Sequence, residues 1–254
     1  MIHPSAVVHP KAKISQSAQI GPFTFIDEHV EIGAGTVVAP HVVINGHTTI
    51  GKNNHFYQFS SIGEANQDTK YRGEPTRTLI GDNNIIRESC TIHRGTTQDH
   101  QLTSIGNDNL LMAYTHIAHD CQLGDHIIIA NSSNIAGHVV IDDWAILGGF
   151  SGVHQFCHIG AHAFLGIRSH ITQDIPPFVL FAEGAPRSIN VEGIKRRGFS
   201  TEEIALLRKA YRIIFRQGLR IEEAVEAVMK LSGSSPVLKL MIDFIQSSVR
   251  GIAR

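Results

Sequence analysis

The chain has 254 residues, and its 22 Lys and Arg nearly balance its 23 Asp and Glu, leaving a formal net charge of −1 at pH 7. This balance excludes the overall basic field typical of proteins that bind nucleic acid or anionic membranes. No run of about 18 apolar residues is present, so we expect no membrane span. Three cysteines without metal-type spacing indicate a reducing, cytoplasmic compartment.

Aliphatic residues recur at every sixth position through roughly the first two thirds of the chain. The series runs from Ile2 to Ile62, returns from Ile80 to Ile92, and after a one-residue slip continues from Ile105 to Ile171, with Phe56 as the only aromatic member. Neither the helical period of 3.6 nor the strand period of 2 produces this spacing alone. It is the signature of a hexapeptide-repeat parallel β-helix, in which each six residues form one short strand and one turn.

Three such segments make one triangular coil, so residues about 18 positions apart stack on neighbouring coils at roughly 4.8 Å. We expect the period residues to point inward and fill the prism. The repeat resembles that of the left-handed β-helix acyltransferases. This resemblance implies a left-handed coil, which is an exception to the usual right-handed crossover.

The predicted fold is therefore an all-β left-handed parallel β-helix over residues 1–185, followed by a small α-helical C-terminal domain over residues 186–254. Within the β-helix we expect loops at 63–79 and 98–104, where the period is interrupted. In the C-terminal part, Ser200 and Glu203 have the spacing of a capping box, and Gly218 is a typical helix stop. Two further amphipathic helices are expected in 221–233 and 235–251, so that the helical part caps the open edge of the coils.

The cysteines have a structural explanation. Cys90, Cys121 and Cys157 each lie four residues after a period position, where most repeats carry another small residue. A small half-buried position explains them better than nucleophilic chemistry does.

Histidines gather on one edge of the predicted prism. The register places Ile92, Ile117, Ile135 and Val153 in one column. Five histidines follow or precede these residues closely and should line successive coils: His93, His116, His119, His138 and His154. The interrupted segment 63–79 leaves the prism as a long loop, which in rigid scaffolds often carries function.

Two chemistries suit clustered histidines. One is general-base catalysis on an extended substrate, since imidazole takes up a proton near neutral pH. The other is a zinc site, to which His116 and His119 could contribute two ligands. A zinc-dependent hydratase of the γ-carbonic-anhydrase kind therefore stays open as an alternative, whereas an ice-binding β-helix would need flat rows of Thr that are not present in the sequence.

Longer motifs carry a more specific resemblance. The stretches "YQFSSIGEANQDTKYRGEPT", "IRESCTIHRGT", "DNLLMAYTHIAHDCQLG" and "NVEGIKRRGF" are similar to the UDP-N-acetylglucosamine 3-O-acyltransferase family over essentially the whole chain. The resemblance implies transfer of an (R)-3-hydroxyacyl group from acyl carrier protein to the 3-hydroxyl of UDP-N-acetylglucosamine, the first step of lipid A biosynthesis. A related N-acyltransferase of that pathway is expected to carry an additional N-terminal domain, whereas the period here begins at Ile2.

The resemblance also implies roles for individual residues. His119 matches the general base, Asp120 the carboxylate that orients it, and Gly137 the backbone N–H that stabilises the oxyanion. The implied substrate-binding residues are Asp68, Lys70, His93, His116, His138, His154, Gln155, Asn190, Glu192, Arg196 and Arg197, with Asp68 and Lys70 reaching a neighbouring subunit. Asn190 to Arg197 would read the uridine and the diphosphate.

The family is a homotrimer with active sites between prisms, and it uses no metal and no cofactor of its own, because the acyl donor arrives on the phosphopantetheine of acyl carrier protein. Basic side chains of the helical part are expected near that carrier. One position departs from the family pattern: Ile167 stands where members that take long acyl chains commonly have glycine. Because each lost methylene contact costs about 0.8 kcal/mol, we expect a preference for shorter hydroxyacyl chains of about ten to twelve carbons.

Overall fold

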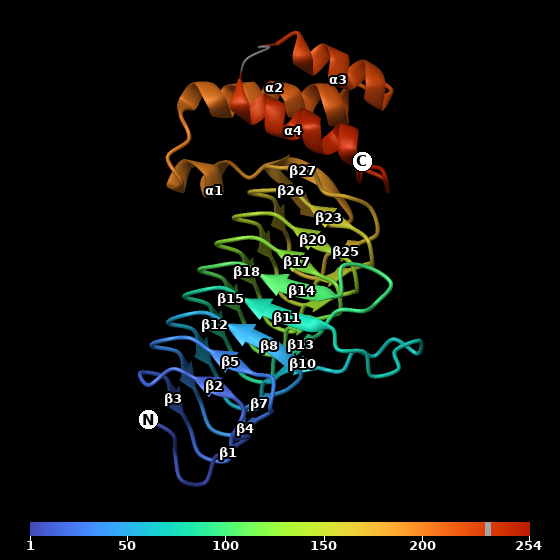
Figure 1. Ribbon diagram of the computed structural model, residues 1–254. Helices are drawn as coiled ribbons and strands as arrows, with labels where there is room; N and C mark the ends of the chain where they lie inside the picture. Colours follow the sequence, from blue (N-terminus) through green and yellow to red (C-terminus); the bar gives the residue numbers. More distant parts are fainter. Residues whose placement is uncertain (232–234) are drawn as a thin grey trace.

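The computed structural model describes residues 1–231 and 235–254. Figure 1 shows a tall prism of stacked coils, with the N-terminus at one end and a layer of helices over the other. Three parallel sheets form the walls of the prism, and each successive coil adds one short strand to each wall. The architecture is the left-handed parallel β-helix with a helical C-terminus that the six-residue period and the resemblance predict.

Sheet I, named for its position first in the chain, consists of β1 (Val7–Val8), β4 (Phe25–Ile26), β7 (Val43–Ile44), β10 (Ser61–Glu64), β13 (Thr91–His93), β16 (His116–Ile117), β19 (Asn134–Ile135), β22 (Gly152–Val153) and β25 (His170–Ile171). Sheet II consists of β2 (Lys13–Ile14), β5 (Glu31–Ile32), β8 (His47–Ile50), β11 (Arg77–Ile80), β14 (Leu102–Ile105), β17 (Gln122–Leu123), β20 (Val140–Ile141) and β23 (His158–Ile159).

Sheet III consists of β3 (Gln19–Ile20), β6 (Val37–Val38), β9 (His55–Phe56), β12 (Ile85–Ile86), β15 (Leu110–Leu111), β18 (Ile128–Ile129), β21 (Ile146–Leu147), β24 (Phe164–Leu165), β26 (Val179–Ala182) and β27 (Ala185–Ile189). From Ile20 onward the period residues of all three sheets face the interior and are almost completely buried, as Ile62 (0% exposed), Ile105 (2%) and Phe56 (0%) illustrate for sheets I, II and III. At the open N-terminal end of the prism Ile2 is 48% exposed. The predicted register is confirmed: Ile92 pairs with Ile117, and Ile117 with Ile135.

The turns between strands contain a feature that the period does not reveal. In most turns the third residue after the period residue has a left-handed backbone, and it is rarely glycine; examples are Asp120 (φ 58°), His138 (φ 61°) and Trp144 (φ 64°). Such a conformation costs roughly 1–2 kcal/mol per non-glycine residue. Backbone hydrogen bonds to the neighbouring coil, such as that from the His138 N–H to the His119 carbonyl (3.0 Å), hold it in place.

The first loop is shorter than expected, and the second lies nearer the N-terminus than expected. Residues 63–64 extend β10, residues 77–79 belong to β11, and residues 102–104 belong to β14, so the loops cover 65–76 and 94–101. The reason is that β8, β11 and β14 pair with one another over four residues rather than two, which continues the ladder beyond the hexapeptide minimum. Both loops leave the prism on the same side (Figure 1).

The last coil ends in an antiparallel hairpin of β26 and β27 that the six-residue period does not indicate. Strand β27 begins at Ala185 and extends past the expected boundary between residues 185 and 186, so the helices begin later than expected. The first of them, α1 (Val191–Arg196), was not predicted. Helix α2 (Thr201–Arg216) has the predicted capping box of Ser200 and Glu203, and Gly218 follows it with φ +67°.

Helices α3 (Ile221–Met229) and α4 (Pro236–Ser247) correspond to the two further predicted helices, and residues 232–233 of the first prediction lie outside the described residues. The helical layer is fastened to the prism through Asp174, whose carboxylate accepts a hydrogen bond from Ser248 (2.6 Å) and whose carbonyl accepts one from the Ala253 N–H (2.9 Å). Within the described part of the chain, no helix has the length and apolar character needed to cross a membrane.

Inward and outward residues of one strand should differ sharply in their contribution to stability. Ile86 is 0% exposed inside the prism, whereas its neighbour Ile85 is 43% exposed on the outer surface. We predict that Ile86→Ala lowers the free energy of unfolding by about 2–5 kcal/mol, because it leaves a cavity in a packed interior. The matched variant Ile85→Ala should cost much less. Equal losses in chemical denaturation would contradict the assignment of the period residues to the core.

Candidate functional site

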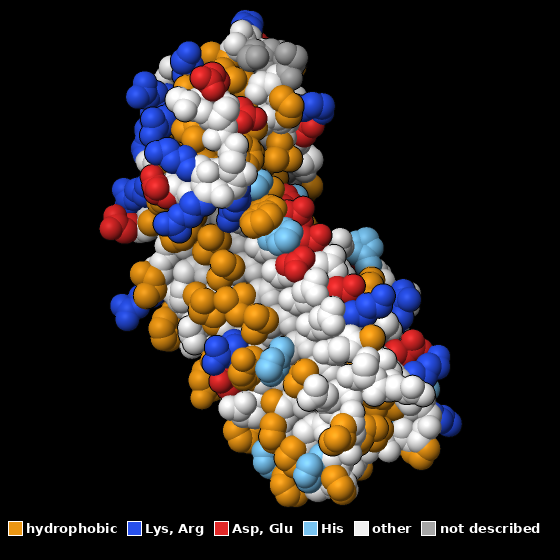
Figure 2. Space-filling view, turned by 90° about the vertical axis from the view of Figure 1, so that its left-hand side faces the viewer, with side chains coloured by type: hydrophobic (Ala, Val, Ile, Leu, Met, Phe, Trp, Pro, Cys, Tyr) orange, Lys and Arg blue, Asp and Glu red, His pale blue; other side chains and the backbone are white. Residues whose placement is uncertain are grey.

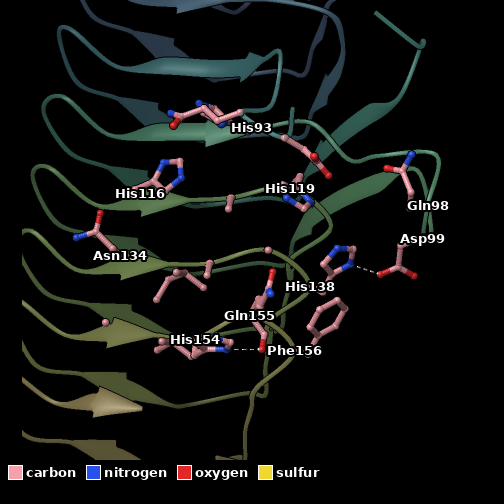
Figure 3. Close-up of a pocket in the computed structure, with 18 of the residues that line it drawn as sticks. His93, Gln98, Asp99, His116, His119, Asn134, His138, His154, Gln155 and Phe156 are labelled. Atoms are coloured by element: carbon pink, nitrogen blue, oxygen red, sulfur yellow. Dashed lines mark hydrogen bonds and ion pairs between the residues drawn. The ribbon is translucent and has the colours of Figure 1, made fainter. Parts of the chain in front are cut away.

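A cavity of about 1100 Å³ opens over sheet I and the turns that follow its strands. Its floor includes the outward residues of adjacent strands, since His116 pairs with Asn134, Asn134 with Gly152, and Gly152 with His170. Figure 3 shows histidines from successive coils facing this space. The predicted residues that line it are Asp68, Lys70, His93, His116, His119, Gly137, His138, His154 and Gln155.

His119 and Asp120 form a dyad at the edge of the cavity. The Nδ1 atom of His119 lies 2.9 Å from Oδ2 of Asp120, so its Nδ1–H donates to the carboxylate and Nε2 keeps its lone pair. The His119 side chain is 17% exposed and that of Asp120 is 0% exposed. Solvent and ligands therefore reach the imidazole but not the carboxylate behind it.

The environment of Asp120 keeps the carboxylate ionised despite its burial. Burial by itself would raise the pKa of Asp120, but hydrogen bonds from His119 and Thr96 outweigh it and the net shift of the pKa is downward. Thr96 donates its backbone N–H (2.9 Å) and its hydroxyl (2.6 Å). A charged, fully hydrogen-bonded carboxylate holds the His119 ring in one orientation and stabilises an imidazolium there.

Gly137 lies directly against the His119 ring. A Cβ atom at Gly137 would lie 2.5 Å from Cε1 and 2.8 Å from Nε2 of His119, so only glycine permits this approach. Among the described residues its amide N–H has no hydrogen-bond acceptor. At the corner after sheet II, by contrast, the corresponding amide of Lys52 donates to Asp82 (2.6 Å). A free donor beside an imidazole nitrogen is the geometry that an oxyanion needs.

His93 and His116 form a second pair, deeper in the cavity. Their rings meet edge to face with centroids 4.9 Å apart, and Nδ1 of His116 is hydrogen-bonded to the Thr91 hydroxyl (2.7 Å). Burial, and then the neighbouring His116, lowers the pKa of His93 to about 4. Burial and then His119 lower the pKa of His116 as well. Both rings therefore stay neutral near pH 7 and suit hydrogen bonding rather than proton uptake.

Several cavity residues were missed by the sequence analysis. Gln98 and Asp99 come from the loop 94–101, and Phe156 and Asn134 come from the turns and strands of the prism. The six-residue period specifies positions only along the coils, so it could not place a loop side chain against His138. Phe156 could have been found, because it occupies the third position after Val153, as His138 does after Ile135.

The cysteines are buried free thiols, as the sequence indicated. Burial raises the pKa of Cys121 to about 12, and that of Cys90 and Cys157 to about 11. The Cys121 thiol donates to the Ala136 carbonyl (3.1 Å). At neutral pH almost none of these thiols is ionised, so they are poor nucleophiles.

One group of possible metal ligands is present among the described residues. It consists of His119, Asp120 and His138, whose ligand atoms lie within 4.8 Å of one another. The pair expected from sequence, His116 with His119, is not this group, because His116 turns its Nδ1 to Thr91. Asp120 is completely buried and already accepts the Thr96 N–H through both of its oxygens, the Thr96 hydroxyl and the His119 ring N–H, which leaves it little capacity for an ion.

Five predicted residues lie outside the cavity of their own chain. Asn190 caps α1, accepting from the Gly193 N–H (3.2 Å) and donating to the His162 carbonyl (3.0 Å). The Arg197 guanidinium hydrogen-bonds His162 (3.0 Å) and lies over the Trp144 ring. The remaining three, Glu192, Arg196 and Ile167, are on the surface, with Ile167 69% exposed at the corner before sheet I.

The family resemblance also implies that Asp68 and Lys70 reach a neighbouring subunit. In the structure both residues line the cavity of their own chain, because the loop 65–76 folds beside the histidines. Asn66 in the same loop donates to the Gly95 carbonyl (3.1 Å), which ties the two loops together.

Comparison with known proteins agrees with the fold. Residues 174–253 match the model of the family described as UDP N-acetylglucosamine O-acyltransferase, domain 2, and residues 11–46 and 102–137 match the bacterial transferase hexapeptide model. The acyl-[acyl-carrier-protein]–UDP-N-acetylglucosamine O-acyltransferase of Herminiimonas arsenicoxydans is 54% identical, covering 100% of this chain and 99% of that protein. The corresponding protein of Pseudomonas putida strain W619 is 55% identical, with coverage of 100% and 99%.

Solved structures give the same result. The UDP-N-acetylglucosamine acyltransferase of Francisella novicida superposes with a TM-score of 0.98 at 45% identity, covering 100% of this chain and 94% of that one. The UDP-N-acetylglucosamine O-acyltransferase of Moraxella catarrhalis has a TM-score of 0.97 at 46% identity, with coverage of 100% and 99%. These acyltransferase relatives give no support to the zinc-hydratase alternative. The chain belongs to the family of acyl-[acyl-carrier-protein]–UDP-N-acetylglucosamine O-acyltransferases.

Proposed function

We propose that this chain transfers an (R)-3-hydroxyacyl group from acyl carrier protein to the 3-hydroxyl of UDP-N-acetylglucosamine, the first step of lipid A biosynthesis. The observation that carries the proposal is the His119–Asp120 dyad beside the free N–H of Gly137, within a cavity large enough for an extended substrate. Family membership supplies the identity of the two substrates. The geometry supplies a base and an oxyanion donor where those substrates would meet.

The reaction follows from these groups. Nε2 of His119 takes the proton of the sugar hydroxyl as its oxygen attacks the thioester carbonyl carbon. The carbonyl oxygen becomes an oxyanion, which accepts a hydrogen bond from the Gly137 N–H, and one such donor is worth about 3 kcal/mol in other acyl transfers. When the tetrahedral intermediate collapses, the carbon–sulfur bond breaks and the imidazolium returns its proton to the leaving thiolate. The raised pKa values of the three thiols support direct transfer without an acyl-enzyme.

The rest of the cavity would hold the substrates. Neutral His93 and His116 offer hydrogen bonds to sugar hydroxyls, and Lys70 offers a positive charge to a phosphate. His154 and Gln155 lie at the end of the cavity away from His93 (Figure 3), where we assign the pantetheine arm. The nucleotide roles of Asn190, Glu192, Arg196 and Arg197 are proposed through a second copy, because none of these side chains lines the cavity of its own chain.

A homotrimer is the proposed assembly. Large apolar side chains are exposed at one corner of the prism, including Phe23 (63%), Phe59 (62%), Tyr114 (65%) and Phe150 (60%). A repeated exposed aromatic row is typical of a protein–protein interface. Figure 2 shows Lys and Arg side chains gathered over one side of the helical layer, where Arg208, Arg212 and Arg216 line a second cavity. An acidic carrier protein is proposed to dock there.

The location and cofactor requirement are also proposals. The three free thiols favour the reducing conditions of the cytoplasm. No cofactor of the enzyme's own is needed in the reaction above, because the phosphopantetheine of the donor protein carries the acyl group and His119 returns the proton that it takes.

The direct test is to incubate the purified protein with UDP-N-acetylglucosamine and an (R)-3-hydroxyacyl carrier protein and to identify the product by mass. We expect an O-acylated nucleotide sugar with the native chain, and about a hundredfold or greater loss of turnover in His119→Ala, because general-base catalysis contributes about 10²–10⁴. His126→Asn, which changes an imidazole at another corner beside Asp108, is the matched control and should retain turnover. Near-normal turnover of a folded His119→Ala protein would remove the proposed base.

The kcat/KM for acyl transfer should decrease on the acidic side of its pH profile, which we call the acid limb. A protonated Nε2 of His119 cannot accept a proton, so acyl transfer should fall on acidification. His93 has a folded-state pKa of about 4 and stays neutral through that limb, so His93→Asn should weaken substrate binding without moving the midpoint. The measurement is kcat/KM against pH for both proteins. A flat profile below neutral pH, or a limb displaced in His93→Asn, would contradict this assignment.

The acyl-chain preference should depend on Ile167. We expect the native chain to prefer hydroxyacyl donors of about ten to twelve carbons, since a β-branched side chain shortens an apolar groove and each methylene contact is worth about 0.8 kcal/mol. Ile167→Gly should extend the accepted chain. Competition between donors of different length, with products separated by mass, measures the preference. An unchanged profile would show that Ile167 does not limit the groove.

A further inference from the structure

The loop 94–101 makes two separate contacts in the site, one to the catalytic carboxylate and one to a substrate-binding imidazole. At its base, Thr96 donates its N–H and hydroxyl to Asp120, the carboxylate that orients His119. At its tip, Oδ2 of Asp99 lies 2.6 Å from Nδ1 of His138, 39 residues away in the chain. Figure 3 shows this contact at the mouth of the cavity. The loop thus restrains both imidazoles through carboxylates. Asp99 of the loop accepts a hydrogen bond from His138, and Thr96 of the loop holds Asp120, which accepts one from His119.

The His138 ring is held by two neighbouring rings and by the Asp99 carboxylate. Its ring stacks on Phe156, with centroids 4.4 Å apart and an interplanar angle of 9°. Its other neighbour, His119, meets it edge to face at 4.9 Å. Only 12% of the His138 side chain is exposed. Stacking fixes the plane of the ring, but it does not determine which ring nitrogen carries the proton.

Four titratable groups around His138 can influence which of its ring nitrogens carries the proton, and they differ in distance and charge. Asp99 contacts Nδ1 directly, and Oδ2 of Asp120 lies 4.0 Å from the same nitrogen. His119 is the nearest group that can become positive, and His100 contacts Asp99 on its outer side (3.2 Å). The hydrogen bond to Asp99 and the nearby negative charge of Asp120 both favour a proton at Nδ1, whether the ring is neutral or charged. The remaining nitrogen, Nε2, has no hydrogen-bond partner among the described residues.

We propose that Asp99 is a positioning residue, which fixes the Nδ1–H form of His138 so that Nε2 is presented to the nucleotide sugar. This inference rests on the proposed function for its substrate, and it deepens that function by assigning a role to a loop that the hexapeptide repeat does not specify. The two imidazoles would then have the same tautomer, because His119 and His138 both donate Nδ1–H to a carboxylate. Each would offer Nε2 to the sugar as a hydrogen-bond acceptor.

The two histidines would therefore have different roles, His119 in the chemical step and His138 in binding. His119 changes protonation during the reaction, and its carboxylate Asp120 is completely buried, whereas Asp99 is 28% exposed and reaches His138 from a loop. A contact made equally in the ground state and the transition state affects KM more than kcat. Loss of Asp99 should therefore weaken binding of the nucleotide sugar rather than the chemical step.

The experiment is a double-mutant cycle on Asp99 and His138, measured as kcat/KM for UDP-N-acetylglucosamine. We expect Asp99→Ala to lower kcat/KM about tenfold or more, mainly through KM, because a charge-assisted hydrogen bond is lost. Asp99→Asn should retain part of the activity through its amide oxygen. In a His138→Ala background, Asp99→Ala should have no further effect. An equal loss in that background would overturn the proposal.

The matched control is Asp142→Ala, which removes a carboxylate from another imidazole, His158 (2.9 Å), on a different wall of the prism. Its kinetics should stay normal. Nitrogen-15 spectra of histidine-labelled protein provide a readout that needs no substrate, with the His138 signals assigned by their loss in His138→Ala. We expect the Nδ1–H pattern in the native chain and its loss in Asp99→Ala; an unchanged pattern would overturn the proposal. If the native chain transferred no acyl group, the proposed function would fail and the spectra would still decide this inference.

Discussion

The structure depends on the stacking of one coil on the next in fixed register. Each period residue, such as Ile117, packs inside the prism against the equivalent residue of the coils above and below, and the backbone of each turn is hydrogen-bonded to its neighbours. If one strand shifted by one residue relative to its neighbour, its buried aliphatic side chain would move to the surface. The hydrophobic effect therefore specifies the register strongly. Groups far apart in the chain thereby reach a rigid, repeatable position.

Rigidity explains how a simple repeat supports precise chemistry. The His119 ring lies against Gly137 with no room for a Cβ atom, and its Nδ1–H meets a completely buried carboxylate. Neither contact relies on a flexible segment, because both residues belong to adjacent turns of the prism. Asp120 has a left-handed backbone (φ 58°), and its side chain accepts hydrogen bonds from Thr96. The cost of that conformation is offset by the hydrogen bonds that it permits.

The loops add what the repeat cannot supply. A coil can present one or two side chains per turn, all at a spacing of about 4.8 Å along the axis. The loop 94–101 adds the Asp99 carboxylate to the lining of the cavity, and the loop 65–76 adds Lys70. The two loops are hydrogen-bonded to each other through Gly95, which accepts from Asn66 and from Thr76 (2.6 Å). They form one wall of the cavity.

The sequence by itself determined the prism, its register, the helical cap and the histidine edge, because these follow from a period of aliphatic residues whose burial dominates the energy. Only the tertiary structure decided that Asp99 meets His138, that His116 turns to Thr91, and that Asn190 caps a helix. These contacts depend on loop paths and side-chain directions. Such choices are set by a few hydrogen bonds between segments far apart in the chain, and no local pattern records them.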